Sequence, residues 1–168
     1  MEAHGAKVIR HPGSYEASVT HSIAEAEKHN WYDANPGGKN TPLQLMAYSE
    51  IANEIYDVLR DAPRMVAVPV SNGTLLAGIF RGFVNLHKRG KTSRIPLMVA
   101  ASSSNKNPIV YSYYKQLDSC IDLVPEKIKE TRINEPLINW HSFDGDEALY
   151  AIRQSGGSAC NISDEKMS

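Results

Sequence analysis

Residues 65–83 decide the fold and read Met-Val-Ala-Val-Pro-Val-Ser-Asn-Gly-Thr-Leu-Leu-Ala-Gly-Ile-Phe-Arg-Gly-Phe. A short, almost wholly apolar run ends at Ser71, and a pattern typical of an amphipathic helix begins at Thr74. This order predicts a buried parallel strand, a tight turn and a helix. The first N–H groups of such a helix have no acceptor within it. The turn is therefore a suitable place to bind a phosphate group.

The turn also has a simpler interpretation, as a strand-to-helix connection that binds nothing. Asn72 and Gly73 can take the left-handed conformations of a tight turn, but a single glycine-containing turn does not require a ligand. The stretch has neither the Gly-Lys-Ser/Thr of a Walker loop nor the three spaced glycines of a dinucleotide-binding loop. The residues alone leave both interpretations open.

Further elements are expected on both sides of this stretch. Residues 96–101 and 159–162 are predicted to be buried strands, and residues 6–9 a short one. Thr41 is predicted to be the N-cap of a helix, with Gln44 completing a capping box. Strands alternate with helices, which predicts an α/β fold with three layers (α/β/α) and a mostly parallel, Rossmann-like sheet. Its centre is expected to contain these apolar residues: Val66, Val68, Val70, Leu76, Ile79, Phe80, Leu97, Val99 and Ile162.

The composition excludes several classes of protein. Among 168 residues, 42% are hydrophobic and 22% charged, which is ordinary for a soluble globular protein. The net charge of −1 gives no long-range attraction for nucleic acid, and no apolar run approaches the length that spans a membrane. The six histidines are scattered without the spacing of a metal site, so no metal is expected. Cys120 and Cys160 are interpreted as two buried thiols of a protein in the reducing cytoplasm.

The two ends of the sequence are unusual. Gly5 has the character of a glycine that ends a helix, yet only four residues precede it. Ser163 and the two acids after it are typical of a helix start, three residues before the end. We therefore expect both ends to cut through structural elements.

Several distinctive segments occur together in one order. They are Met1–Arg10, Gly13-Ser14-Tyr15-Glu16-Ala17, Trp31-Tyr32-Asp33-Ala34-Asn35-Pro36-Gly37, Ile51-Ala52-Asn53-Glu54-Ile55, the strand–turn–helix stretch, Ile133-Asn134-Glu135-Pro136, Ser155-Gly156-Gly157 and Ser163-Asp164-Glu165. With these segments the chain resembles the threonine synthase branch of the fold-type II pyridoxal-phosphate enzymes. The resemblance implies that residues 1–168 are one partial domain, most of the large lobe, with residues 1–30 contributed by the edge of the smaller lobe.

The resemblance also implies a cofactor site. In that family the turn after the strand binds the phosphate of pyridoxal 5'-phosphate, and the matching residues are Ser71, Asn72, Gly73, Thr74 and Leu75. The family usually has glycine at the positions of Ser71 and Thr74, and Asn or Thr at that of Leu75. A Cβ at a position that needs positive φ, or one close to a phosphate oxygen, costs about 1 kcal/mol or more. We therefore expect a weakened site.

A second departure concerns the Schiff-base lysine, which lies in a Ser-Phe-Lys-Asp-Arg-like segment of the family. None of the lysines here has that context, so no catalytic residue is assigned. We expect no activity of this chain alone. A complementary polypeptide carrying the lysine lobe would complete a lyase of threonine biosynthesis that converts O-phosphohomoserine to L-threonine. The alternatives are a non-catalytic phosphate-binding or cofactor-binding module and a homo-oligomer that covers surface meant for missing lobes.

Overall fold

The computed structural model describes residues 1–167, which form two compact units, the first of residues 1–35 and the second beginning at Pro36. The first unit contains a short 3-10 helix, η1 (Glu2–His4), and the helix α1 (Tyr15–His29). Gly5 ends η1 with a φ of 82°, and the Ser14 side chain accepts the N–H of Ala17 at 3.2 Å. The predicted terminating glycine is thus confirmed.

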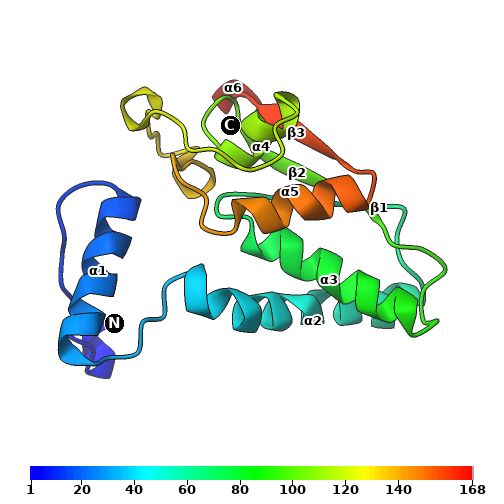
Figure 1. The fold of residues 1–168 in the computed structure, drawn as a ribbon, viewed down its shortest axis with the longest axis horizontal. Helices are drawn as coiled ribbons and strands as arrows, with labels where there is room; N and C mark the ends of the chain where they lie inside the picture. Colours follow the sequence, from blue (N-terminus) through cyan, green and yellow to red (C-terminus); the bar gives the residue numbers. More distant parts are fainter. Residues whose placement is uncertain (168) are drawn as a thin grey trace. The chain divides into compact units, whose positions relative to one another are not determined.

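The second unit is an α/β domain (Figure 1). Its elements, in chain order, are η2 (Gly38–Asn40), α2 (Thr41–Leu59), β1 (Met65–Pro69), α3 (Thr74–Lys88), β2 (Leu97–Ser103), α4 (Pro108–Tyr114), η3 (Pro125–Lys127), η4 (Glu135–Leu137), α5 (Gly145–Gln154), β3 (Ser158–Ile162) and α6 (Asp164–Met167). The strands lie in the order β1-β2-β3 and both pairs are parallel. The α/β fold with a parallel sheet that the sequence predicts is confirmed.

The sheet register places one row of small apolar side chains across all three strands. Val68 pairs with Ala100, and Ala100 pairs with Ala159. All three residues are buried, because α3, α4 and α5 pack on this face of the sheet. On the other face Met65 is 53% exposed, and Ala67 and Pro69 are also exposed.

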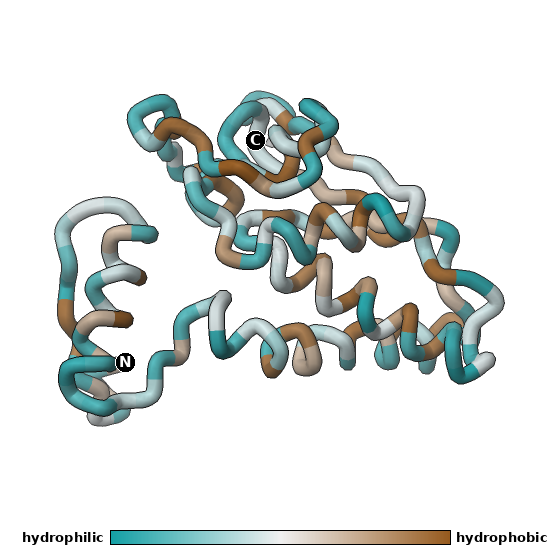
Figure 2. The backbone as a smooth tube through the Cα atoms, viewed as in Figure 1, coloured by the Kyte–Doolittle hydropathy of each residue, from teal (hydrophilic) through white to brown (hydrophobic). Residues whose placement is uncertain are grey.

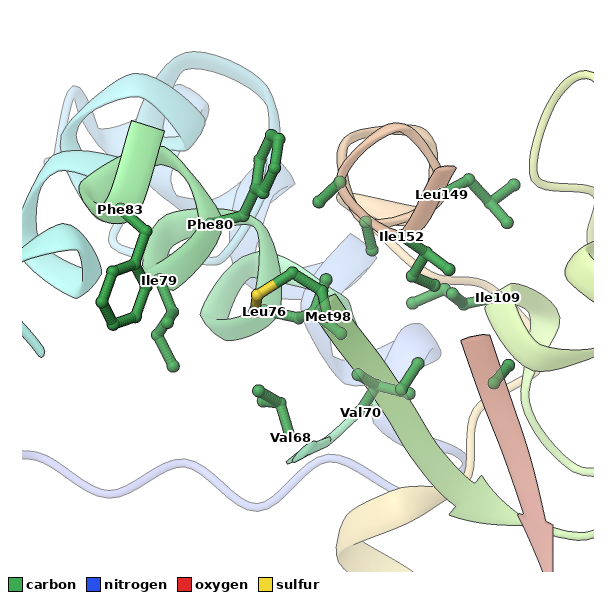
Figure 3. Close-up of a cluster of buried hydrophobic side chains, with 14 of the residues drawn as sticks. Val68, Val70, Leu76, Ile79, Phe80, Phe83, Met98, Ile109, Leu149 and Ile152 are labelled. Atoms are coloured by element: carbon green, nitrogen blue, oxygen red, sulfur yellow. The ribbon is translucent and has the colours of Figure 1, made fainter. Parts of the chain in front are cut away.

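The core lies between this sheet face and the helices, as Figure 3 shows. It contains these fully or almost fully buried residues: Val68, Val70, Leu76, Ile79, Phe80, Phe83, Met98, Ile109, Leu149 and Ile152. Five of the nine predicted core residues belong to this cluster, and Val66 packs against it. Leu97, Val99 and Ile162 lie outside the cluster, since their positions in the register put them on the opposite face. Val99 is nevertheless buried there, whereas Leu97 and Ile162 are only half-buried.

Two local predictions are wrong. Residues 6–9 form no strand, because among the described residues no strand pairs with them. Thr41 is the first residue of α2 and not its N-cap; Asn40 takes that position, with no side-chain cap bond. α2 packs along α3, and apolar and polar segments alternate along both helices (Figure 2). None of the helices in residues 1–167 combines the length and apolarity needed to cross a membrane.

Candidate functional site

The five residues singled out by the sequence, Ser71–Leu75, form the connection between β1 and the first turn of α3, and we call them the 71–75 loop. They lie at the carboxyl end of the sheet, which is where parallel α/β folds bind ligands. The loop lines a cleft of about 420 Å³. Gln44 and Tyr48 of α2 and Pro136 and Leu137 of η4 also line this cleft. The structure thus brings all five predicted residues together at one opening.

The carbonyl oxygen of Ser71 is held from inside the protein by three side chains. It accepts hydrogen bonds from Asn107 Nδ2 at 3.0 Å, Asn139 Nδ2 at 3.2 Å and Ser142 Oγ at 2.9 Å. These three residues are between 1% and 7% exposed. The direction of the Ser71 carbonyl is therefore fixed by a buried polar network.

The carbonyls on either side are held in the same way. Val70 O accepts from Ser102 Oγ at 2.9 Å and from Asn107 Nδ2 at 3.3 Å. Asn72 O accepts from the backbone N–H of Asp144 at 3.0 Å. Three consecutive carbonyls, from residue 70 to residue 72, thus point toward donors in the protein interior.

This arrangement sets the direction of the loop N–H groups. In a planar trans peptide the N–H points opposite to the C=O, and the described chain contains no cis peptide. The N–H groups of Ser71, Asn72 and Gly73 therefore point away from the interior donors. Because these residues line the cleft, we infer that their N–H groups face it. Together with the N–H groups of the first turn of α3 they would provide donors of the kind that anions bind in proteins.

Gly73 is the N-cap of α3 and has a φ of 93°. It is the single residue of the loop with positive φ, and Asn72 does not take the left-handed conformation that the sequence allows it. A Cβ at Gly73 would lie 2.8 Å from both Ala148 Cβ and Asp144 O. Ser71 and Thr74 do not have positive φ, so the backbone strain expected from side chains at these two positions is absent.

A buried carboxylate lies beside the loop. Asp144, 4% exposed, accepts a hydrogen bond from Thr41 Oγ1 at 2.6 Å through one oxygen and from Thr74 Oγ1 through the other. Thr41, Thr74 and Asp144 stand at the amino ends of α2, α3 and α5, so three positive helix ends converge on this charge. The Thr74 hydroxyl donates to Asp144, and the described residues that line the cleft include no lysine or arginine. Anion binding here would therefore depend on backbone N–H groups and on uncharged donors such as the Ser71 hydroxyl.

Two serines at the carboxyl end of β2 have structural roles. Ser102 bonds to Val70 O and to Leu137 O, and Ser103 bonds to Asp164, so they hold the polypeptide chain at the sheet edge. Across residues 1–167, no group of His, Cys, Asp and Glu side chains is arranged to bind a metal. The interpretation of both cysteines as buried is wrong, because Cys160 is exposed.

Sequence reasoning does not identify Asn107, Asn139 and Ser142 as site residues. The pattern around Asn107 indicates only the start of a helix, and residues 118–143 have no clear pattern. One signal is present in principle, because an asparagine N-cap uses only its side-chain oxygen. When that side chain is buried, its NH2 group needs acceptors of its own, and here these are the carbonyls of Val70 and Ser71.

Comparisons with known proteins agree on one family. Residues 1–167 match the family described as pyridoxal-phosphate dependent enzyme. Threonine synthase of Methanocaldococcus jannaschii is 30% identical over 98% of this chain and 39% of its own length. Threonine synthase of Methanosarcina acetivorans is 28% identical with the same coverage. The chain thus spans about two fifths of the length of these relatives.

Two solved structures share the fold. A threonine deaminase from T.th. superposes with a TM-score of 0.69 at 17% identity, over 98% of this chain and 49% of that protein. Serine racemase from Dictyostelium discoideum gives a TM-score of 0.62 at 15% identity, over 97% of this chain and 46% of that protein. At these identities the likeness concerns the fold.

Proposed function

The chain belongs to the pyridoxal-phosphate dependent enzyme family, and on this premise we propose that its 71–75 loop binds the phosphate of that cofactor. The resemblance to threonine synthases is confirmed by the relatives, so the enzyme to which this chain contributes is proposed to be threonine synthase-like. The proposal assigns Ser71, Asn72, Gly73, Thr74 and Leu75 to the phosphate. We also propose that the protein is located in the cytoplasm.

The observation that carries the proposal is the orientation of the loop peptides. Three consecutive carbonyls accept bonds from the interior. From the planarity of the peptides we infer that the three N–H groups opposite these carbonyls face the cleft. Gly73 supplies the positive φ that lets the chain turn into α3 at this point. These features fit a phosphate group, which binds to oriented backbone N–H groups at a helix start.

Bound pyridoxal phosphate supplies an electron sink for carbanion chemistry once a lysine amine holds it. The residues described here would contribute binding and orientation. The loop N–H groups would hold the phosphate, while Tyr48, Pro136 and Leu137 would border the opening and exclude water from part of it. Asp144 would hold the Thr74 hydroxyl and so keep the first turn of α3 in place.

The full activity requires the amine. Residues 1–168 contain no lysine in the family's segment, so we propose that a complementary polypeptide supplies it and that this chain alone is inactive. The complex would then convert O-phosphohomoserine to L-threonine. In this proposal the second polypeptide corresponds to a segment of the related threonine synthases that lies outside the 39% matched by this chain. The second candidate is a phosphate-binding module without catalysis, which would need only the 71–75 loop and its cleft.

The phosphate site is tested by nuclear magnetic resonance on the ¹⁵N-labelled chain. Inorganic phosphate and pyridoxal phosphate are titrated separately at constant ionic strength, with chloride as the control ion. The expected result is saturable shifts concentrated in the backbone amides of residues 71–76. Shifts spread over surface lysines, or no saturation, would overturn the assignment. Borohydride reduction followed by peptide mapping identifies any lysine that reacts with the aldehyde.

The activity is tested by phosphate release from O-phosphohomoserine. The chain alone is expected to release none. Addition of a polypeptide carrying the lysine lobe of a threonine synthase is expected to produce release together with L-threonine. Phosphate binding without release in any such mixture would favour the binding module.

A further inference from the structure

Asn107 uses the two halves of its side-chain amide for different purposes. Its Oδ1 accepts the N–H groups of Ile109 at 3.0 Å and Val110 at 3.3 Å, which caps α4. Its Nδ2 donates toward Val70 O, Ser71 O and Asn139 Oδ1, at 3.3, 3.0 and 2.9 Å. A flipped amide would place NH2 against the two helix N–H groups. The cap therefore fixes the direction in which the NH2 group points.

Asn139 extends this arrangement. Because its Oδ1 accepts from Asn107, its own NH2 group must face the other way. That group lies 3.2 Å from Ser71 O, 2.9 Å from Ser142 Oγ and 2.7 Å from His141 O. The cap of α4 thus fixes the amide of Asn107, and the amide of Asn107 fixes that of Asn139. Both amides donate to the carbonyl of Ser71 in the 71–75 loop.

We propose that Asn107 and Asn139 are a pair of positioning residues that orient the Ser71 peptide and thereby set the affinity of the loop for a phosphate group. This inference rests on the proposed function. Neither residue lines the cleft, so neither is assigned to touch the anion. Their effect is on the direction of the Asn72 N–H, which is opposite to the Ser71 carbonyl that both amides hold.

The pair differs from residues that only stabilise the fold. Loss of a merely structural bond lowers the free energy of unfolding but leaves the affinity of the folded molecules unchanged. Loss of a positioning bond also changes the orientation of the loop peptides, and with it the ligand affinity, in the folded state. The test must therefore measure the loop and its affinity separately from stability.

Asn107→Ser is the first variant, because serine is a good N-cap but is too short to reach the loop carbonyls. Asn139→Ser is the second, and it leaves the cap of α4 untouched. Ser155→Ala is the matched control. The Ser155 hydroxyl also accepts a backbone N–H, that of Met98 at 3.0 Å, but at the start of β2 and far along the strand from the loop.

Three quantities are measured on each full chain: the free energy of unfolding in urea, the ligand-free shift of the Asn72 amide, and the dissociation constant of inorganic phosphate. Both asparagine variants are expected to shift the Asn72 amide and to raise the dissociation constant about fivefold or more. The control is expected to stay within about twofold of the wild type, although it loses similar stability.

The inference is overturned if the Asn72 amide and the phosphate affinity of the folded asparagine variants match those of the control. The ligand-free shift keeps this test separate from the proposed function. If the wild type binds no phosphate, the proposed function fails, and the Asn72 amide still decides whether the pair orients the loop. If one variant does not fold, the other supplies the same comparison.

Discussion

Replacement of Gly73 by alanine tests how tightly the 71–75 loop is built into the fold. The residue has a φ of 93°, where an L-amino acid costs about 1–2 kcal/mol. The new Cβ would lie 2.8 Å from Ala148 Cβ, 2.8 Å from Asp144 O and 2.9 Å from Ile109 Cδ1. A methyl group forced into a packed interior costs about 1–3 kcal/mol more. Gly73→Ala should therefore lower the free energy of unfolding by about 2–5 kcal/mol.

Gly90 provides the matched control, because it has a φ of 67° and a Cβ added there would have no heavy atom within 4 Å. Gly90→Ala should cost only the backbone term of about 1–2 kcal/mol. Both variants are unfolded in urea and followed by circular dichroism, and the difference between them isolates the crowding at Gly73. If Gly73→Ala loses no more stability than Gly90→Ala, the close packing of the loop against α5 is refuted.

Three further outcomes are expected. Asp144→Asn should raise the phosphate affinity of the loop about two- to fivefold by removing a buried negative charge beside it, and a lower affinity in a titration would contradict this. Hydrogen bonds from the Ser93 side chain and backbone lower the pKa of Asp61 from 3.8 to about 2, so its contribution to stability is complete above pH 4 and is lost as the pH falls toward 2. Asp61→Asn should flatten that part of the unfolding free energy profile, and equal slopes in the two proteins would refute the assignment. Burial raises the pKa of Cys120 to about 11, so iodoacetamide at pH 8 should label the exposed Cys160 before Cys120. Mass spectrometry of timed samples measures the two labelling rates, and equal rates would contradict this prediction.

The sequence is most informative where local pattern and tertiary packing agree. The apolar run before Ser71 predicts β1, and the helical spacing after it predicts the inward residues of α3, which are buried. The predicted strand at residues 6–9 fails because a strand exists only when another strand pairs with it. A run of four residues, three of them apolar, carries no information about that partner.

For a similar reason, the site can be predicted only in part from the sequence. Gly73 and its neighbours are recognisable as a turn, because glycine before a helix is a local signal. Asn139 is not recognisable, because its role depends on contacts with Asn107 and Ser71, which are 32 and 68 positions away. Thr41 leads to a wrong prediction, because a threonine in this position is typical of a helix N-cap. Its hydroxyl instead donates to the carboxylate of Asp144, 103 positions away.

The bonds to Asp144 also determine when the loop can form during folding. They connect positions separated by 103 and 70 residues, so they arise only after α2, α3 and α5 have docked. A peptide of residues 65–88 contains the whole loop sequence but none of the groups that orient it. Ligand retention by this protein should therefore follow the cooperative assembly of its second unit. Hydrogen exchange of the Asp144 N–H, which donates to Asn72 O, should slow in step with exchange in α5.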